Sequence, residues 1–511
     1  MYHTIGNAVF SFLEAVLTFD QQSIEKASEA LKTSINLCDE CRRKCSLSES
    51  IGKIVRKPSY DNLTAEEMHA ELCYAESLLL KSMLTFIEDE TLVSFIKAGL
   101  KIRTCFNSYK ECSNILKSRN WSNESHKIHF ESGVRVGIGA FNLMISQLPS
   151  RAIKLLEFIG FSGSKEIGLR ELNACYRLHE GIRQVLSVMT LLTYNLIVVY
   201  ILSHTDGDLD MCDEILQCQL KLYPEGAWFL YFKGRLEFMR GNINDANNWY
   251  VKSWKSQSVW PQFHHLCFWE LMWTNCVKQD WEEAAMHASS LLSESRWSRT
   301  IYGYQKVSMM LMMKSLTKEQ KEEISLLIKN IPGWRQKIAG KSLPMEKFCA
   351  KRCERYIVQG QFLVLPAIEL LYVWNFFKVL GKTWHYCHAV YKLILNTIME
   401  MEGEKWPNSE FNQDNKALLL LLKGACLNQM GSPLQAEECF KEVLSLEKKI
   451  KEDHFLPPFA MVELAITYYK EGSALKAIQL LEDVKKNYTG YSLESRLHFR
   501  IHSALIDFAK K

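Results

Sequence analysis

The stretch PEGAWFLYFKGRLEFMRGNINDANNWYVKS, residues 224–253, decides the fold. Apolar side chains recur at helical spacing on both sides of Gly241-Asn242, which predicts two amphipathic helices joined by a tight turn. Within it lie two small residues, Gly234 and Ala246, and an aromatic residue, Tyr250. Small residues let two helices cross closely, and a bulky residue one helical turn further on would close the contact.

The same spacing recurs elsewhere in the chain, with small residues twelve positions apart and a bulky residue four later. The two further clear copies are Gly424, Ala436 and Phe440, then Ala465, Ala477 and Leu481, and a looser copy is Ala15, Ala27 and Leu31. This spacing of small and bulky residues is typical of the tetratricopeptide repeat. Since one such hairpin cannot bury its apolar face alone, we expect an all-α fold of tetratricopeptide-type hairpins stacked into a superhelical solenoid.

Composition restricts the possible functions. The chain has 511 residues, and its hydrophobic fraction of 47% permits a large core. Lys plus Arg number 62 and Asp plus Glu 58, so the formal charge of +4 does not indicate a nucleic-acid partner. Sixteen cysteines without a signal-peptide pattern predict a reducing compartment, and therefore a cytoplasmic protein.

Two segments suggest the domain organisation. The polar segment 204–210 predicts a boundary between an N-terminal half, 1–205, with a glycine-rich central helix, and a C-terminal repeat half, 206–511. In the first half, Thr64 and Glu67 form the pattern of a capping box. Gly133, Gly137 and Gly139 each cost a helix about 1 kcal/mol relative to Ala, so we expect another backbone to approach them closely.

Residues 185–203 contain no charged side chain over nineteen positions. That length would suit a membrane-spanning helix. The stretch also holds Asn195 and several Tyr, Thr and Ser residues, which favour a central helix buried on all sides. A membrane span or peripheral membrane contact stays open as the alternative.

No catalytic, cofactor-binding or metal-binding residue is predicted, and we do not expect an enzyme. Cys38, Cys41 and Cys45 offer three thiols on one helix face, whereas a structural zinc site needs four ligands. A packed face is the favoured interpretation, as it is for three shorter groups: Cys349 with Cys353, His385 with His388, and His264-His265 with Cys267. The glycines of 137–142 and 160–164 match neither a dinucleotide fingerprint nor a nucleophile elbow.

A partner groove is the function that the repeats favour. In this kind of repeat the first helix lines the concave surface, and helical spacing predicts which side chains face it. The predicted groove residues are Trp228, Tyr231, Arg235, Met239, Trp269, Trp273, Phe459, Val462, Ile466 and Tyr469. Aromatic and Arg side chains carry binding energy at interfaces. They equally suit packing against neighbouring helices, so both interpretations stay open.

The chemistry of these positions indicates the kind of partner. Repeats that hold the carboxylate of a chaperone tail use Lys, Asn and Arg at such places, whereas here they are mostly aromatic or aliphatic. We therefore expect protein partners with apolar or helical segments.

Longer motifs resemble a known family. They are HAELCYAE at 69–76, KIR at 101–103, FESGV at 130–134 with Leu148-Pro149, LLEFIGFSG at 155–163 and YPEGAW at 223–228. Together they resemble the tetratricopeptide-repeat protein 39 family, related to a fungal inclusion-clearance protein of the mitochondrial outer membrane. The resemblance implies a non-enzymatic adaptor linked to lipid homeostasis. Its alternative is a protein associated with a lipid droplet or a mitochondrial surface.

One departure from the family pattern concerns the N-terminal end. Family members usually carry a further helical segment before the position of Met1, so we expect a shortened form.

Overall fold

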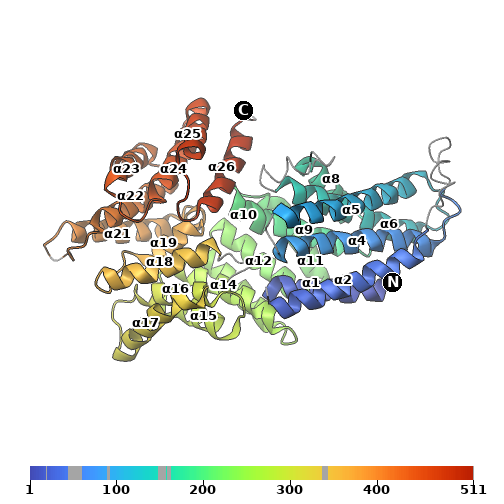
Figure 1. Ribbon diagram of the computed structural model, residues 1–511, viewed down its shortest axis with the longest axis horizontal. Helices are drawn as coiled ribbons and strands as arrows, with labels where there is room; N and C mark the ends of the chain where they lie inside the picture. The colour runs from blue at the N-terminus through green and yellow to red at the C-terminus, as the bar shows by residue number, and fades with distance from the viewer. Residues whose placement is uncertain are drawn as a thin grey trace. The chain divides into compact units, whose positions relative to one another are not determined.

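The computed structural model describes residues 1–18, 20–43, 60–88, 92–147, 157, 163–336, 343–404 and 406–509, with the backbone alone over 86–101. Within these ranges the regular secondary structure is helical and contains no strand (Figure 1). The chain divides into two compact units, Met1–Thr193 and Tyr194–Lys511. The sequence placed the boundary after residue 205, whereas the units divide inside the charge-free helix.

Unit 1 consists of paired helices. Its helices are α1 (Tyr2–Thr18), α2 (Gln21–Cys41), α4 (Ala65–Glu88), α5 (Leu92–Ser118), α6 (Glu124–Ser146), α8 (Lys165–Tyr176) and α9 (Gln184–Thr193). α1 packs on α2, α4 on α5, and α6 on α8. The predicted capping box is confirmed, because the Glu67 carboxylate accepts from the Thr64 backbone at 2.8 Å and the Thr64 hydroxyl accepts from the Glu67 backbone at 3.1 Å.

Another backbone approaches Gly139 of α6 as expected, since a Cβ there would lie 3.1 Å from the Gly168 carbonyl oxygen, whereas side chains approach Gly133 and Gly137. A Cβ at Gly137 would lie 1.9 Å from the Tyr109 ring. A Cβ at Gly139 would lie 2.7 Å from Leu172. The predicted cost of these glycines to the helix is therefore offset by close packing. The predicted helix 151–158 and the turn 160–164 lie largely outside the described residues.

Unit 2 is a longer array of hairpins. It starts with a π-helical turn (Tyr194–Val198) and α10 (Val199–Leu202), then α11 (Leu209–Leu222), α12 (Ala227–Arg240), α13 (Ile243–Lys255), α14 (Pro261–Lys278), α15 (Trp281–Glu294) and α16 (Arg299–Met310). It continues with α17 (Lys318–Asn330), α18 (Pro344–Val358), α19 (Pro366–Val373), α20 (Phe377–Leu380), α21 (Trp384–Met401), α22 (Asn412–Gln429), α23 (Pro433–Ser445), α24 (Leu456–Lys470), α25 (Ala474–Asn487) and α26 (Glu494–Phe508). Short 3₁₀ turns occupy Ile331–Trp334 and Glu447–Lys449.

The decisive stretch forms the hairpin α12–α13. Gly241 ends α12 in the left-handed region at φ 84°, where glycine is favoured, so the predicted tight turn is confirmed. The small-residue spacing is confirmed as well. Gly234 lies against Tyr250, Gly424 lies against Phe440, and Ala465, Ala477 and Leu481 are all fully buried.

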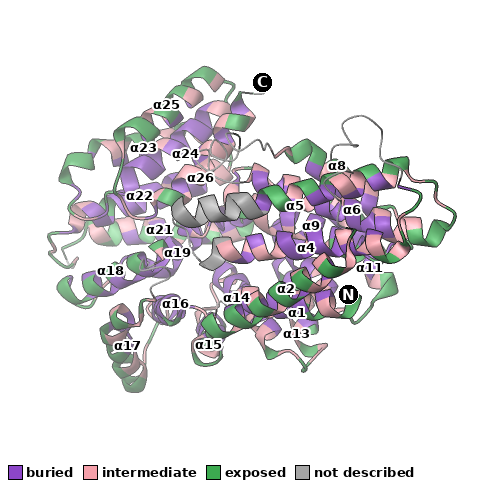
Figure 2. Cartoon of the chain, turned by 45° about the vertical axis from the view of Figure 1, so that its right-hand side comes forward, coloured by how far each residue is buried: buried purple, intermediate pink, exposed green. Residues whose placement is uncertain are grey.

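Successive hairpins pack in chain order, and the array also folds back on itself. α13 packs on α14, α15 on α16, and α23 on α24, as stacked repeats require. α19 contacts α14 and α16, and α20 contacts α12, so later helices cover the first hairpins. Figure 2 shows α22 and α24 mostly buried, whereas α23 and α25 carry exposed stripes.

The charge-free helix is interrupted by a π-helical turn. Gln184–Leu202 is long and apolar enough to cross a membrane, and among the described residues it is the one helix with that property. Half of its apolar window is buried (50%), and Val185, Leu186 and Ile201 are exposed. The expectation of a helix buried on all sides is therefore wrong for one of its faces.

Candidate partner-binding site

The predicted groove residues of α12 take part in internal polar contacts. The Arg235 guanidinium lies 2.9 Å from the Glu270 carboxylate and donates to the Leu196 carbonyl at 2.8 Å. The Tyr231 hydroxyl donates to the same carboxylate at 3.2 Å. The Arg235 side chain is 4% exposed and that of Glu270 is 5% exposed. This buried pair joins α12 to α14.

An internal segment fills the inner side of the first hairpins. Trp374, Asn375 and Phe376 form the turn between α19 and α20. The Phe376 ring lies 4.7 Å from that of Trp273, and the Trp374 ring lies 5.0 Å from that of Trp269. Asn375 holds the turn at φ 68°, a conformation that Asn tolerates, and its amide donates to the Tyr200 carbonyl at 2.9 Å.

The remaining predicted groove residues also contact neighbouring helices. Trp228 packs edge-on against Phe263 at 4.8 Å, and Tyr469 stacks on Phe508 at 3.7 Å. Met239, Phe459 and Val462 are buried, and Ile466 lines a cavity. These contacts agree with the packing interpretation, while a role of the ten residues in partner binding stays a prediction.

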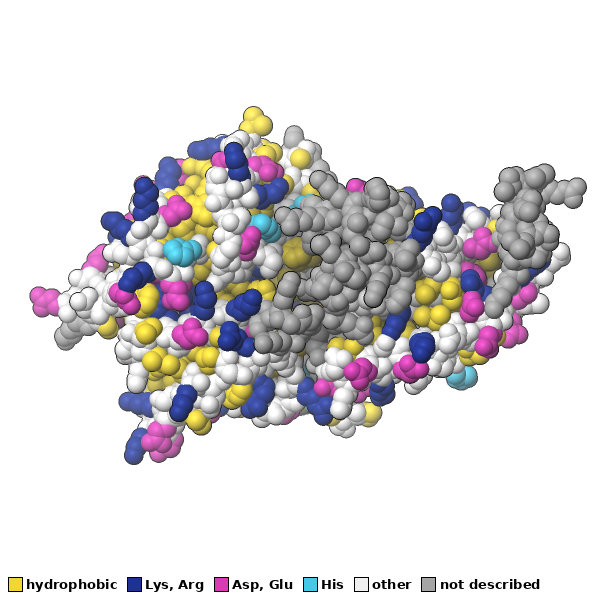
Figure 3. Space-filling view, viewed as in Figure 1, with side chains coloured by type: hydrophobic (Ala, Val, Ile, Leu, Met, Phe, Trp, Pro, Cys, Tyr) yellow, Lys and Arg dark blue, Asp and Glu magenta, His cyan; other side chains and the backbone are white. Residues whose placement is uncertain are grey.

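That cavity, of about 410 Å³, lies inside unit 2. α20, α22, α24 and α26 contribute side chains to it, together with residues 204–206 before α11. Its charged lining residues are Asp206, Lys378, Lys382, Glu463, Lys470 and Arg500. Cations therefore outnumber carboxylates in the lining. On the face shown in Figure 3, by contrast, basic and acidic side chains are interspersed.

Lys378 is the most desolvated lysine of the cavity. Its Nζ donates to the Ser203 carbonyl at 3.2 Å and to the Thr205 carbonyl at 2.8 Å, and it lies 4.0 Å from Asp206 Oδ1. Burial lowers the pKa of Lys378 to about 7, against a smaller opposing effect of Asp206. The ammonium group is therefore held mainly by neutral carbonyls.

The cavity lining also contains a paired carboxylate. Glu463 accepts from the Arg500 guanidinium at 3.0 Å and from the Tyr372 hydroxyl at 3.0 Å. Burial would lower the pKa of Arg500, but the charge interactions and hydrogen bonds with Glu463 and Tyr372 together outweigh burial, so the pKa is raised. Arg500 thus stays charged, and its Nε has no hydrogen-bond partner among the described residues.

The sequence analysis did not predict this cavity. Ile466 alone of the predicted groove residues lines it. Lys378 lies on the short helix α20 and Lys382 just after it, while Arg500 lies on α26, which does not carry the repeat spacing. Lys470 directly follows Tyr469, one of the predicted groove residues. The prediction for α24 was therefore the part of the sequence analysis that came nearest to the cavity.

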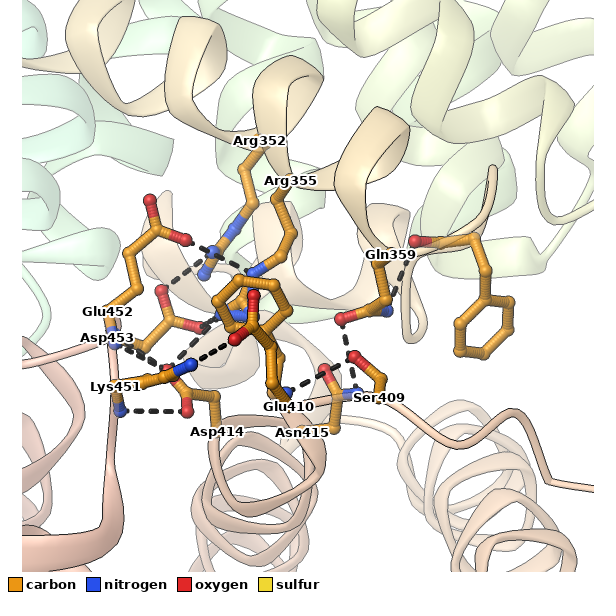
Figure 4. A network of polar contacts seen from close by, with 12 residues as sticks. Arg352, Arg355, Gln359, Ser409, Glu410, Asp414, Asn415, Lys451, Glu452 and Asp453 are labelled. Atoms are coloured by element: carbon orange, nitrogen blue, oxygen red, sulfur yellow. Dashed lines mark hydrogen bonds and ion pairs between the residues drawn. The ribbon is translucent and has the colours of Figure 1, made fainter.

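A second charged cluster is structural. Arg352 and Arg355 of α18 converge on Asp453, at 2.7 Å and 2.9 Å (Figure 4). Arg352 also pairs with Glu369 at 2.9 Å. Asp414 accepts from the backbone amides of residues 451, 452 and 453 at 2.9 to 3.0 Å. Burial would raise the pKa of Asp453, but the two guanidinium groups outweigh it and lower the pKa. These ion pairs and hydrogen bonds connect α18 and α22 to the segment before α24.

The cysteine and histidine groups do not form a metal site within the described ranges, which exclude Cys45. No three His, Cys, Asp or Glu side chains come together there in a way that would hold a metal ion. Cys349 and Cys353 are buried, and Cys38 is buried against unit 1 helices.

Stacked hairpins with small residues at their crossings define a helical-repeat protein of the tetratricopeptide class. The sequence model of the Iml2/Tetratricopeptide repeat protein 39 family matches residues 1–430, and the chain belongs to this family. Tetratricopeptide repeat protein ttc-39B of Caenorhabditis elegans is 38% identical over 510 residues, which cover 99% of this chain and 86% of that protein. The resemblance seen in the motifs is thereby confirmed.

Two solved structures also align with the chain. The P58(IPK) TPR domain is 13% identical over 87% of this chain and 96% of that one, with a TM-score of 0.18. The APC/C hetero-tetramer Cut9-Hcn1 is 10% identical over 99% of this chain and 95% of that one, with a TM-score of 0.27. Scores this low carry no argument, so the assignment stands on the sequence matches.

Proposed function

We propose that the protein is a non-enzymatic adaptor that binds other proteins through the inner face of unit 2. The cavity between α20, α22, α24 and α26 is the observation that carries this proposal. The first hairpins of the unit have their inner side filled by Trp374, Asn375 and Phe376. Binding is therefore assigned to the later hairpins.

The later hairpins have the properties of a binding surface. α22 and α24 pack side by side and present Asn428, Ile466 and Lys470 to the same cavity. Side chains held on packed helices lose little conformational entropy when a partner binds, which favours affinity. An apolar or helical partner segment would find Ile466 and Phe377 at this place.

Affinity capture from cells tests the proposal. The bait is the full chain, and the test variant is Asn428→Trp with Ile466→Trp, which places two bulky uncharged side chains in the cavity. The control variant, Leu434→Trp with Leu475→Trp, changes two exposed side chains on α23 and α25. We expect the test variant alone to lose a reproducible subset of partners while its thermal unfolding stays within a few degrees of wild type. An identical set of partners from both variants would contradict the proposal.

A cytoplasmic location with contact to an organelle or lipid-droplet surface is the second candidate. It is supported by the exposed face of Gln184–Leu202, with Val185, Leu186 and Ile201. It also agrees with the link to lipid homeostasis that the family resemblance implies. An exposed apolar face on a long helix is a feature of interfacial membrane helices.

Vesicle flotation tests the second candidate. Purified wild-type protein is mixed with phosphatidylcholine vesicles and with vesicles containing anionic lipid, and compared with Leu186→Glu. Flotation of the wild type that the variant loses would support membrane contact, and a wild type that stays at the bottom of the gradient would exclude it.

A further inference from the structure

We propose that the cavity of unit 2 binds a carboxylate-rich segment of a partner protein, an inference that rests on the proposed function. Four basic side chains and two carboxylates line the cavity, so the basic side chains remain in excess even where Lys378 is neutral. His204 adds no charge at neutral pH, because burial lowers its pKa to about 4. The lining therefore offers more positive charge than its own acids neutralise.

The two carboxylates of the lining are already engaged. Asp206 pairs with Lys382 and lies within 4.0 Å of Lys378. Glu463 accepts from Arg500 and Tyr372. Lys470 makes no ion pair with any residue that the structure describes, although it lines the same cavity. An incoming carboxylate would thus find Lys470 available and the Lys378 ammonium group held mainly by carbonyl oxygens.

The cavity is larger than a single anion needs. Its volume of about 410 Å³ compares with about 30 Å³ for one water in the liquid. Beside the cations lie the amides of Asn428 and Gln429, which can bond a peptide backbone, and the apolar side chains of Phe377 and Ile466. This mixture fits a peptide that carries acidic side chains next to an apolar one, since charge complementarity selects the partner and apolar contact adds affinity.

Lys378 makes the binding dependent on pH. The groups that face it are Asp206, Lys382, Lys470 and Arg500, and its Nζ also lies 5.2 Å from the Tyr200 ring. With a pKa of about 7, Lys378 is only partly protonated at neutral pH. A bound carboxylate favours the charged form, so binding takes up protons and tightens as the pH falls from 8.5 to 6. The neighbouring Glu463, Tyr372 and His204 complete the titratable lining.

Binding of peptide libraries to the purified full chain tests the inference. The acidic library has Glu or Asp at alternate positions and randomised residues between them, and the matched library has Gln or Asn there. We expect wild type to retain the acidic library about tenfold better, and Lys470→Glu to remove this preference. Lys448→Glu is the control, because it makes the same charge change at an exposed residue outside the cavity.

Three further arms complete the test. Lys378→Met should abolish the pH dependence between pH 6 and 8.5; if that variant fails to fold, Lys382→Gln provides a second loss of cavity charge. Inorganic phosphate and a phosphoserine library distinguish a general anion site from a carboxylate site. Equal retention of acidic and neutral libraries, an unaffected Lys470→Glu variant, or competition by millimolar phosphate alone would overturn the inference. Variant-sensitive capture of cellular partners without any acidic preference would leave the adaptor proposal intact and refute only the carboxylate site.

Discussion

A Cβ atom on Gly234 would lie 2.6 Å from the ring of Tyr250, sixteen residues further along the chain. Gly424 has the same relationship with Phe440, also at 2.6 Å. In both hairpins the aromatic ring of the second helix occupies the space that the glycine of the first helix leaves free. The shared spacing of sixteen residues therefore corresponds to the same contact between the two helices of each hairpin.

The first prediction concerns this contact. Gly234→Ala should lower the free energy of unfolding by about 1–3 kcal/mol, because the added methyl group forces the Tyr250 ring out of its position. Thermal unfolding followed by circular dichroism measures the effect. Gly333→Ala is the control, since nothing lies within 4 Å of the added Cβ at that position. Equal unfolding temperatures for the two variants would contradict the packing argument.

The second prediction concerns the buried pair of Arg235 and Glu270. Glu270→Ala should cost about 3–5 kcal/mol, because it leaves a guanidinium group buried without its carboxylate. Arg235→Glu would also disturb folding, because it places a second buried carboxylate beside that of Glu270, so a loss of partner binding in that variant would not show that Arg235 contacts the partner. Urea unfolding followed by tryptophan fluorescence measures the change.

The matching control is an exposed ion pair. Lys318 and Glu322 lie 3.9 Å apart with side chains 87% and 68% exposed, so Glu322→Ala should change stability by less than about 1 kcal/mol. A similar effect of both substitutions would show that burial does not govern the Arg235 pair.

The third prediction is a pH dependence of stability that arises at Asp453. Its folded-state pKa lies below the ordinary value, so its carboxylate contributes stability above the unfolded-state pKa, about 3.9. That contribution is lost as the pH falls through the lower, folded-state pKa. Glu369 has the opposite effect on the pH dependence. Burial raises its pKa, so its ionised form destabilises the folded state relative to its protonated form.

Unfolding temperatures at pH 7 and pH 3.5 test this prediction. Asp453→Asn should destabilise the protein at pH 7 and reduce the difference between the two pH values. Asp210→Asn, at a fully exposed side chain 3.8 Å from Arg240, should leave that difference unchanged. An Asp453→Asn variant with the full wild-type difference would place the acid sensitivity elsewhere.

The fourth prediction concerns thiol reactivity. Cys218 is exposed, whereas Cys276 is fully buried and burial raises its pKa well above the usual range. Brief treatment of folded protein with iodoacetamide should therefore alkylate Cys218 at least about tenfold faster than Cys276, because the accessible thiolate is the nucleophile. Peptide mass spectrometry measures both rates, and the difference should disappear in urea. Equal rates in the folded state would contradict the described burial.

Local features of the fold were predictable because each depends on residues close in sequence. The capping box of Thr64 and Glu67 and the turn at Gly241 are set by hydrogen bonds and backbone conformation within one helical turn. The glycines of α6 were recognisable by their cost to a helix, although the sequence did not show that Tyr109 and Leu172 would contact them. Periodicity grouped the apolar side chains of α12, α14 and α24 on one side of each helix, but it did not show what contacts them.

The cavity could not be predicted from local sequence patterns. Its lining comes from five segments between residues 204 and 500, and Lys378, Lys470 and Arg500 meet only because α20, α24 and α26 line one cavity. An isolated lysine on a helix has the same pattern whether it faces solvent or a cavity. The predicted aromatic groove could not be tested by the same pattern. A side chain that binds a partner and one that packs against a neighbouring helix recur with the same helical spacing.

The sequence by itself determined the helical class, the hairpin unit and the family, because helical periodicity and small-residue spacing are local and repeat along the chain. Only the tertiary structure decided that Trp374 and Phe376 fill the inner side of the first hairpins. It also decided that a cation-lined cavity remains in the later hairpins. Both depend on helices far apart in sequence that pack together, and the curvature that brings them together is the sum of many small packing angles between repeats.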